Sequence, residues 1–189
     1  MRLSVIVPAF NEEAYLASTL DSLRDAAGGL RAETGAEIET IVVDNGSTDR
    51  TAAIAREWGA DVVHELEQGI ARARNSGAQH ANGEVLVIVD ADVIVPRGFL
   101  SGIHDAMSDP ACMGGGVDTI CRPRRLPVRL YLRGWRLLAR LTGMVQGAAQ
   151  FCRRDAFEQL GGYDEGLWIG EDVDFVWRLR RLGRPSVSM

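Results

Sequence analysis

The stretch at residues 84–92 constrains the fold of this chain more than any other part of the sequence. It contains an unbroken apolar run at residues 85–89, rich in β-branched side chains, and it ends with Asp90 and Asp92. Such a run is typical of a strand buried on both faces, as the strands of parallel sheets are. Ligands of open α/β sheets collect beyond the carboxyl ends of the strands. The two carboxylates therefore either bind a divalent cation together with a ribose or a bridging water, or they only end the strand and begin the turn before Pro96.

Strand-like and helix-like segments alternate four times in the first half of the chain. The predicted strands cover residues 3–7, 38–43, 61–64 and 85–89. Such alternation is typical of a mostly parallel sheet whose strands are joined by right-handed crossovers. We therefore expect an α/β fold, Rossmann-like, with helices flanking the sheet and a single domain over residues 1–189.

The first predicted helix begins at Asn11, an asparagine cap followed by Glu12 and Glu13, which the helix dipole favours in a first turn. Leucines at helical spacing follow, and Gly28 and Gly29 are expected to end this helix. Further helices are expected through residues 54 and 58 and at 69–81, 97–107, 126–141, 155–160 and 171–182. The Gly-rich segment at 112–121 has strand-like ends, and a short strand is expected to end at 151–152.

Composition excludes several classes of function. With 189 residues, 46% hydrophobic and 25% charged, the chain suits one globular domain. Its net charge of -5 gives no general case for nucleic-acid binding, and because all 21 basic residues are arginine, lysine-based chemistry is excluded. Cys112, Cys121 and Cys152 are spaced for neither a disulfide framework nor a zinc site. The N-terminal apolar stretch is too short for a signal peptide and no window suffices to span a bilayer, so we expect a cytoplasmic protein.

Three polar loops follow predicted parallel strands and are expected to meet in one crevice. They contain Pro8, Ala9, Phe10, Asn11 and Glu12; Asp44, Asn45, Gly46 and Ser47; and Asp90, Ala91 and Asp92. None is a Walker loop or a Gly-x-Gly-x-x-Gly dinucleotide loop. A nucleotide can still be held by backbone groups of the first loop, a carboxylate of the second and a cation at the third. Each acid also has a structural alternative, since Asp44, for example, is well placed to open a turn.

Five segments of the sequence resemble the motifs of a known family, the family 2 glycosyltransferases of GT-A fold. They read SVIVPAFNEE, VDNGSTD, ARNSG, VDAD and GEDVD, at residues 4–13, 43–49, 73–77, 89–92 and 170–174. They occur in the order and at the spacing usual for the family, and they span nearly the whole chain. An ordered set of this kind is far more specific than any one of its members.

The resemblance implies inverting transfer of a sugar from a nucleoside-diphosphate donor, expected to be a UDP-sugar, with Mn²⁺ or Mg²⁺. The accepting group would be a hydroxyl or a lipid phosphate. The acceptor itself would be a glycan, a lipid-linked molecule or a small molecule. Residues 1–92 would form the nucleotide-binding half and residues 93–189 the acceptor and catalytic half. By the same resemblance Asp172 is the base, Glu171 orients the acceptor or the base, and Asp92 and Asp90 bind the cation. The nucleotide would lie on Pro8, Ala9, Phe10, Asn11, Glu12, Asp44, Arg74, Asn75 and Asp90.

The chemistry agrees with these roles. A divalent cation stabilises the charge of a leaving nucleoside diphosphate without proton transfer, and a nearby carboxylate can take the proton of an attacking hydroxyl. Glu171 and Asp172 are adjacent in the first turn of a predicted helix, so they diverge by about 100° and only one can point at a shared acceptor atom. The alternative is that both acids, with Asp174, only complement the helix dipole.

Two departures from the family pattern bear on specificity and extent. Many members carry two acids where this chain has Asp44 and Asn45, which makes the choice of a uridine donor less secure. The chain ends at residues 185–189, soon after its last predicted helix, whereas many relatives continue, often with a histidine that completes the metal site. A truncated enzyme and a minimal enzyme both stay open. The Gln-x-x-Arg-Trp motif of processive synthases is absent, so we expect no processive synthesis.

Three other functions stay open. A sugar nucleotidyltransferase also uses a parallel sheet and a metal, but residues 8–13 are not the Gly-rich basic loop that it needs. A non-catalytic nucleotide-sugar binding module, or a truncated inactive fragment, would lack an acceptor site. A Rossmann-like scaffold with incidental acids would bind no nucleotide.

An arginine stripe is expected on the predicted helix at residues 126–141. It consists of Arg129, Arg133, Arg136 and Arg140, with leucines along the other side. Two interpretations stay open: a solvated face, or a face that lies on the inner surface of an anionic membrane or binds a phosphorylated lipid acceptor. Residues 147–150, which follow, resemble the acceptor-contacting region of the family. The three histidines, His64, His80 and His104, are scattered and are expected at the surface.

Overall fold

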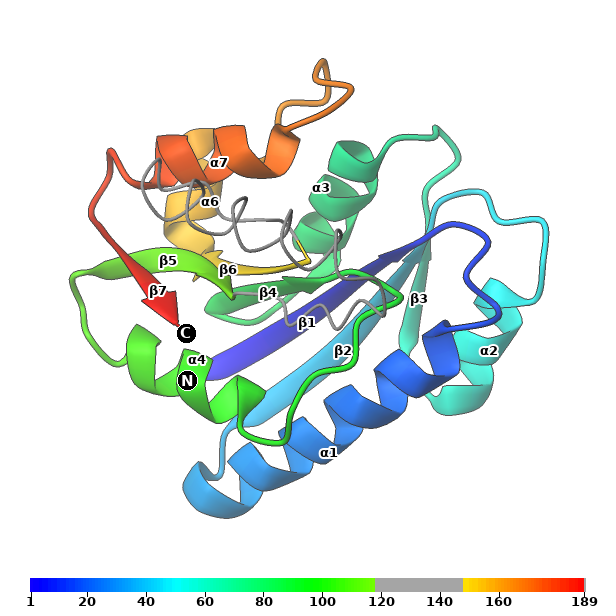
Figure 1. Ribbon diagram of the computed structural model, residues 1–189, viewed down its shortest axis with the longest axis horizontal. Helices are drawn as coiled ribbons and strands as arrows, with labels where there is room; N and C mark the ends of the chain where they lie inside the picture. Colours follow the sequence, from blue (N-terminus) through cyan, green and yellow to red (C-terminus); the bar gives the residue numbers. More distant parts are fainter. Residues whose placement is uncertain (118–147, 189) are drawn as a thin grey trace, which may run out of the picture.

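The computed structural model describes residues 1–117 and 148–188, whose strands form a single sheet (Figure 1). These strands are β1 Arg2–Ala9, β2 Glu37–Asp44, β3 Asp61–His64, β4 Val85–Val89, β5 Cys112–Val117, β6 Ala149–Arg153 and β7 Arg184–Ser188. The seven strands lie in the order β3-β2-β1-β4-β6-β5-β7. β6 is antiparallel to both of its neighbours, and the other described pairs are parallel. The predicted mostly parallel α/β sheet is therefore confirmed.

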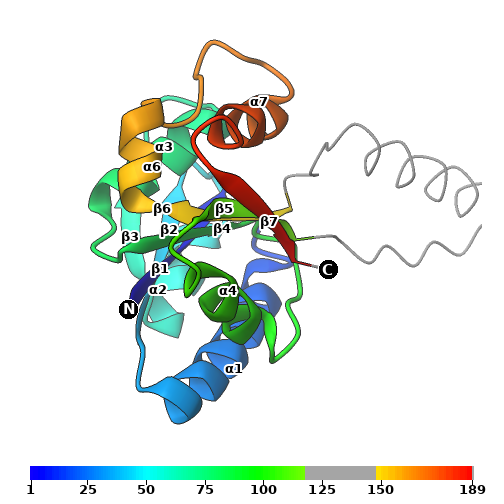
Figure 2. The same cartoon turned by 90° about the vertical axis from the view of Figure 1, so that its left-hand side faces the viewer.

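Helices cover both faces of the sheet (Figure 2). They are α1 Leu16–Thr34, α2 Thr51–Trp58, α3 Ile70–His80, α4 Phe99–Met107, α6 Arg154–Leu160 and α7 Glu171–Leu179. α1, α2 and α4 contribute to one core cluster, and α3, α6 and α7 contribute to a second one. Along β4, Val85, Val87 and Val89 enter the first cluster while Leu86 and Ile88 enter the second. The strand expected to be buried on both faces is buried on both faces.

The expected bounds of the first helix were wrong at both ends. Asn11 is not its cap: it has a left-handed φ of 55°, and its Oδ1 accepts hydrogen bonds from Thr48 in the neighbouring loop. α1 begins only at Leu16 and continues past the two glycines to Gly35, whose φ is 70°. Burial of the leucine face outweighs the cost of about 1 kcal/mol that each helical glycine carries. Tertiary contacts thus override both local signals.

The second half departs from the expectations in two places. The Gly-rich stretch at 112–117 is strand throughout, with a register shift between Cys112 and Gly114. Gly114 suits its position because a Cβ there would overlap the main-chain oxygen of Phe151 on β6. β7 was not predicted, and Pro185 within it is tolerated because β7 is an edge strand. The helix predicted at 126–141, with Arg129, Arg133, Arg136 and Arg140, lies outside the described residues, as does Cys121.

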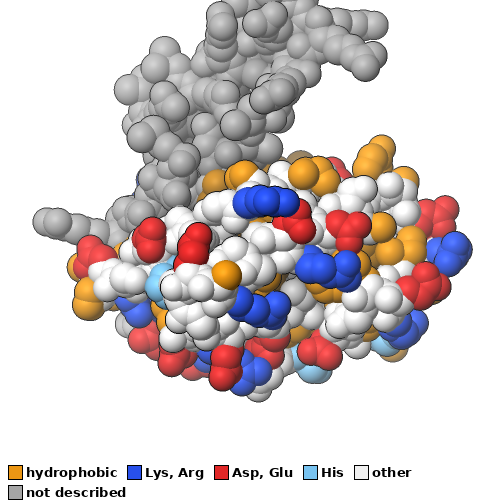
Figure 3. Space-filling model, turned by 90° about the horizontal axis from the view of Figure 1, so that it is seen from below, with side chains coloured by type: hydrophobic (Ala, Val, Ile, Leu, Met, Phe, Trp, Pro, Cys, Tyr) orange, Lys and Arg blue, Asp and Glu red, His pale blue; other side chains and the backbone are white. Residues whose placement is uncertain are grey.

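The outer surface of α1 carries acids interspersed with arginines (Figure 3). Asp21 and Arg24 form an exposed ion pair there, and Arg97 pairs with Asp25. This face therefore has the mixed charge of an ordinary solvated surface. Among residues 1–117 and 148–188, none of the helices combines the length and the apolar content that crossing a bilayer requires.

Candidate active site

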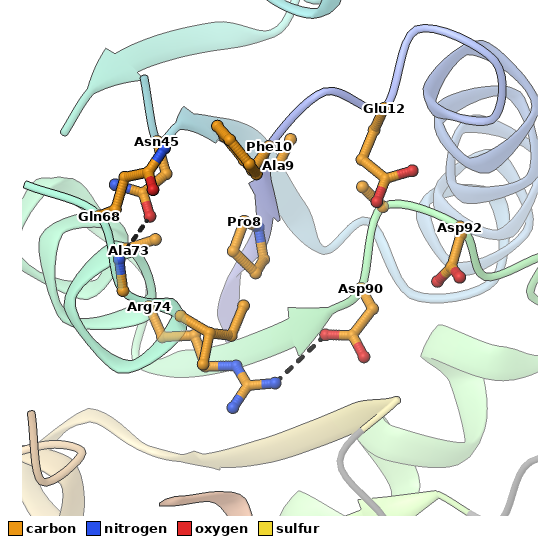
Figure 4. Close-up of a pocket in the computed structure, with 13 residues that line it drawn as sticks. Pro8, Ala9, Phe10, Glu12, Asn45, Gln68, Ala73, Arg74, Asp90 and Asp92 are labelled. Carbon is orange, nitrogen blue, oxygen red and sulfur yellow. Dashed lines mark hydrogen bonds and ion pairs between the residues drawn. The ribbon is translucent and has the colours of Figure 1, made fainter. Parts of the chain in front are cut away.

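A cavity of about 460 Å³ opens where the carboxyl ends of β1, β2 and β4 meet (Figure 4). The parallel pairing of β1 with both neighbours brings the loops that follow these strands to one edge of the sheet. The cavity is lined by Pro8, Ala9, Phe10, Glu12, Asn45, Gln68, Gly69, Ile70, Ala73, Arg74, Asp90, Ala91 and Asp92. The expectation that the three loops converge on one crevice is confirmed.

Three carboxylates share one end of the cavity. Burial, followed by the charges of Asp92, Asp49 and Asp90, raises the pKa of Glu12 above its ordinary value. Burial also raises the pKa of Asp90, and the charge of Asp92 adds to this effect although Arg74 opposes it. Asp92 itself is exposed. This end of the cavity therefore favours positively charged ligands.

Arg74 lies beneath this acidic end. Its Nη1 donates to Glu171 Oε1 at 2.7 Å and its Nη2 donates to Asp90 Oδ1 at 3.2 Å. The side chain is 4% exposed, and its guanidinium lies 5.2 Å from the centre of the Tyr163 ring. Burial alone would lower the pKa of Arg74, but interactions with Tyr163, Asp90 and Glu171 outweigh it, so the pKa is raised. Its Nε is buried and has no partner among the described residues.

The first turn of α7 brings two acids to the same region, after Gly170 with its left-handed φ of 84°. Glu171 is buried against Arg74, so its carboxylate is already committed to an ion pair. Asp172 is half-buried, and its Oδ1 accepts the main-chain N–H of Val173. The charge of Asp172 acts on Asp90 and contributes to its raised pKa. Of the two acids, only Glu171 pairs with Arg74, so the carboxylate of Asp172 is not committed to that guanidinium.

Three residues expected at the nucleotide do not line the cavity. Asn11 fastens its loop to Thr48, as described above. Asp44 is 7% exposed, with Oδ1 accepting from the Ser47 N–H and Oδ2 lying 3.0 Å from His64 Nδ1. Asn75 hydrogen-bonds both the main-chain carbonyl and N–H of Tyr163, and its amide N–H also donates to Glu165. All three polar side chains satisfy neighbouring groups instead of the cavity.

One residue of the site was not singled out from the sequence, and two others have contacts that the sequence did not predict. Gln68 lines the cavity from the loop after β3, and the signal that could have found it is its position beyond the carboxyl end of a parallel strand. His64 lies at the surface, as expected, but it also contacts Asp44. Gln150 is buried and donates to the main-chain oxygen of Asp172, so it supports α7. Of the segment at 147–150, expected to contact the acceptor, residue 147 lies outside the described ranges, and Ala149 and Gln150 are buried in β6.

The residues at the acidic end fit a divalent cation bound together with a ligand. In the described part of the chain no cluster of three or more His, Cys, Asp or Glu side chains could hold a metal alone. Mg²⁺ and similar ions are commonly held by one or two carboxylates plus substrate phosphates. Asp92 and Asp90 supply such a pair; burial is the main cause of the raised pKa of Asp90, the charge of Asp92 adds to it, and a cation would relieve that repulsion.

The chain matches the sequence model of glycosyl transferase family 2 over residues 4–161. It is 30% identical to the pre-mycofactocin glycosyltransferase of Mycobacterium tuberculosis over 96% of this chain and 39% of that protein. It is also 30% identical to an uncharacterized glycosyltransferase of Mycobacterium bovis, over 98% of this chain and 89% of that protein.

Solved structures agree with the family match. A mannosyltransferase from Pyrobaculum calidifontis, in complex with GDP-Man and Mn²⁺, is 27% identical with a TM-score of 0.77, over 99% of this chain and 54% of that chain. The present chain thus spans about half of that mannosyltransferase and less than half of the M. tuberculosis relative. The resemblance drawn from the five motifs is confirmed, and so is the GT-A fold. The chain belongs to glycosyl transferase family 2.

Proposed function

We propose that this chain transfers a glycosyl group from a nucleoside-diphosphate sugar to an acceptor hydroxyl, with inversion at the anomeric carbon. One observation carries the proposal: the buried Arg74 bonds both Asp90, at 3.2 Å, and Glu171, at 2.7 Å, so the first turn of α7, which bears Asp172, lies beside the end of β4. An acid suited to be a base therefore lies beside the acids suited to a diphosphate-bound cation. Family membership supports the same reaction class.

The donor nucleoside lies along the first loop in this proposal. Pro8, Ala9 and Phe10 line the middle of the cavity, and Phe10 is 46% exposed, which leaves an aromatic face for a base or ribose to pack against. Asp90, at the end of β4, accepts a hydrogen bond from the ribose or contributes to the cation. A UDP-sugar is the first choice of donor, and a GDP-sugar is the alternative because the P. calidifontis relative was solved with GDP-Man.

Asp92 and Asp90 would hold Mn²⁺ or Mg²⁺, which would supply positive charge to the leaving diphosphate. The Mn²⁺ present in the P. calidifontis complex supports this assignment. Because Asp92 is exposed, it can approach a ligand without breaking any contact within the described residues.

Asp172 takes the proton of the attacking hydroxyl. A carboxylate in this role needs only to lie within hydrogen-bond reach of the hydroxyl on the face opposite the leaving group. Glu171 does not share the role, because its carboxylate is buried against Arg74 at 2.7 Å. It acts as a positioning residue, holding the first turn of α7 so that Asp172 faces the cavity. Direct attack with a single base produces inversion.

Calorimetry of the chain with UDP and GDP, with and without Mn²⁺, tests donor binding, and hydrolysis of the corresponding nucleotide sugars tests chemistry. We expect one nucleoside diphosphate to bind with Mn²⁺-dependent affinity and its sugar to be slowly hydrolysed. Binding without any hydrolysis or transfer would instead identify a nucleotide-sugar binding module. Absence of binding by every nucleoside diphosphate would leave only a scaffold and reject the proposal.

A further inference from the structure

The cavity has two chemically different ends (Figure 4). Glu12, Asp90 and Asp92 lie toward one side, whereas Asn45 and Gln68 lie on the other, with the first loop between them. A ligand with a cation-bound diphosphate at the acidic end extends its other end toward the two amides. The amide end is therefore where the base of a nucleotide would be recognised.

Asn45 has no N–H group left for such recognition. Its Nδ2 donates to the main-chain oxygens of Glu65, at 3.0 Å, and Glu67, at 2.8 Å. Its Oδ1 accepts the N–H of Gly69 at 2.9 Å. The side chain is buried and works as a clamp that fastens the loop at 65–69 to the end of β2.

Asp44 is also occupied. Its two carboxylate oxygens contact the Ser47 N–H and His64 Nδ1, and the side chain is outside the cavity lining. His64 in turn lies 2.6 Å from Arg56 through Nε2. The carboxylate that the family resemblance assigns to the nucleoside is thus tied into a chain of contacts behind the loop.

Gln68 is different from both. It is exposed, it lines the cavity, and its side-chain amide makes no hydrogen bond to the residues that the structure describes. Its backbone is nevertheless held on both sides, because Glu67 and Gly69 are the residues that Asn45 clamps. An unengaged amide therefore projects from a fixed backbone at the neutral end of the cavity.

We propose that Gln68, and not Asp44, reads the hydrogen-bonding edge of the donor's nucleobase. This inference rests on the proposed function, since it requires a nucleoside diphosphate in the cavity. An amide offers both a donor and an acceptor, so it pairs with an edge that presents an acceptor beside a donor. Uracil and guanine both present such an edge, with a carbonyl next to a ring N–H. Gln68 then determines how well each of them is held.

The test is Gln68→Glu, with UDP and GDP titrated in the presence of Mn²⁺. A carboxylate only accepts hydrogen bonds. Guanine offers two adjacent donors, the ring N–H and the exocyclic amino group, so a carboxylate can accept two hydrogen bonds from it, whereas uracil offers only its single ring N–H. The ratio of the UDP Kd to the GDP Kd should rise by about tenfold, the change that one hydrogen bond to a charged group gives.

Gln79→Glu is the matched control. Gln79 is exposed near the far end of α3 and does not line the cavity, so its substitution adds the same charge without reaching the base, and the Kd ratio should equal that of the parent. Gln68→Ala provides a second variant: both Kd values should rise, with an unchanged thermal midpoint because the side chain is exposed.

The outcomes separate the two proposals. Nucleotide binding that persists in Gln68→Glu with an unchanged Kd ratio overturns the role of Gln68 and leaves the proposed function standing. A parent chain that binds neither UDP nor GDP overturns both.

Discussion

Arg74 Nη1 lies 2.7 Å from Glu171 Oε1, and both side chains are buried although 97 positions separate the two residues in the sequence. The same guanidinium also reaches Asp90 through Nη2. One arginine on α3 thereby joins the end of β4 to the start of α7. The position of the Asp172 side chain, in the first turn of α7, depends on this pair.

Glu171→Ala should lower the free energy of unfolding by about 3 kcal/mol, because it removes the nearer counter-charge of a buried arginine. Arg74→Met should also destabilise the chain, since it leaves Glu171 buried without a partner. The double variant should be more stable than the sum of the two effects by about 1–3 kcal/mol. Urea denaturation measures the free energy of unfolding of the parent, the two single variants and the double variant. If the effects of the two substitutions are strictly additive, Arg74 and Glu171 are not energetically coupled.

Asp172→Asn should lower the rate of glycosyl transfer by about 10²–10⁴-fold, the usual contribution of a general base. Donor affinity should be unchanged, because the side chain lies beyond the cavity lining. Asp174→Asn is the matched control: Asp174 is in the same turn of α7 but pairs with Arg178 at 2.7 Å. A transfer assay and calorimetry on the two variants decide the role, and equal rates in both would remove Asp172 as the base.

Asp92→Asn should abolish the gain in nucleotide affinity that Mn²⁺ provides while leaving the metal-free affinity intact. The reason is that Asp92 is exposed and makes no hydrogen bond within the described residues, so its substitution disturbs only the ligand end. A chelator added to the parent chain should produce the same loss. If titrations show that Mn²⁺ still strengthens UDP or GDP binding to the variant, the cation is held elsewhere.

Most of the sheet could be predicted because its signals are local. The β-branched run of β4 and the acids that follow it needed no information from other parts of the chain. Parallel pairing then placed three loops at one edge, so the cavity followed from strand order. β7 could not be predicted from local sequence, because it is an edge strand whose extended conformation depends on pairing with β5.

The fine structure of the site depends on contacts that no local pattern encodes. Asn11 is a residue type typical of helix caps, yet its side chain accepts a hydrogen bond from Thr48 in another loop. Asp44 and Asn45 are residue types that often bind ligands, yet their side chains contact neighbouring backbone groups and His64. Gln68 shows the reverse case. It belongs to no sequence motif, and it becomes a candidate for binding the nucleobase only because Asn45 holds the backbone of its two neighbours in place.

Two glycines in helices should respond in opposite directions to alanine. Gly28, in α1, has open space where a Cβ would stand, with no atom within 4 Å, so Gly28→Ala should stabilise the chain by about 0.5–1 kcal/mol. Gly77, in α3, would place a Cβ within van der Waals overlap of Ile6 and Val43, so Gly77→Ala should destabilise it by about 1–3 kcal/mol. Thermal denaturation of both variants provides the comparison, and equal shifts would argue against the close packing of α3 on the sheet.

Glu39, on β2, should make stability depend on pH at the acid end of the scale. Burial alone would raise its pKa, but hydrogen bonds donated by Ser4, Asn82 and Arg2 hold the pKa at about 2, below the ordinary 4.5. A carboxylate with a lowered folded-state pKa stabilises the fold above its unfolded-state pKa, and this contribution is lost as pH falls from about 4.5 toward 2. One pKa unit corresponds to about 1.4 kcal/mol, but solvent screens this partly buried carboxylate, so the contribution is on the order of 1 kcal/mol.

Glu39→Gln should therefore be less stable than the parent at about pH 6, and this difference should shrink as the pH approaches 2. Glu37→Gln, at the exposed start of the same strand, is the matched control and should follow the parent at each pH. Urea denaturation at several pH values measures the free energies. A difference between Glu39→Gln and the parent that stays constant down to about pH 2 would mean that the bonds from Ser4, Asn82 and Arg2 do not favour the ionised carboxylate.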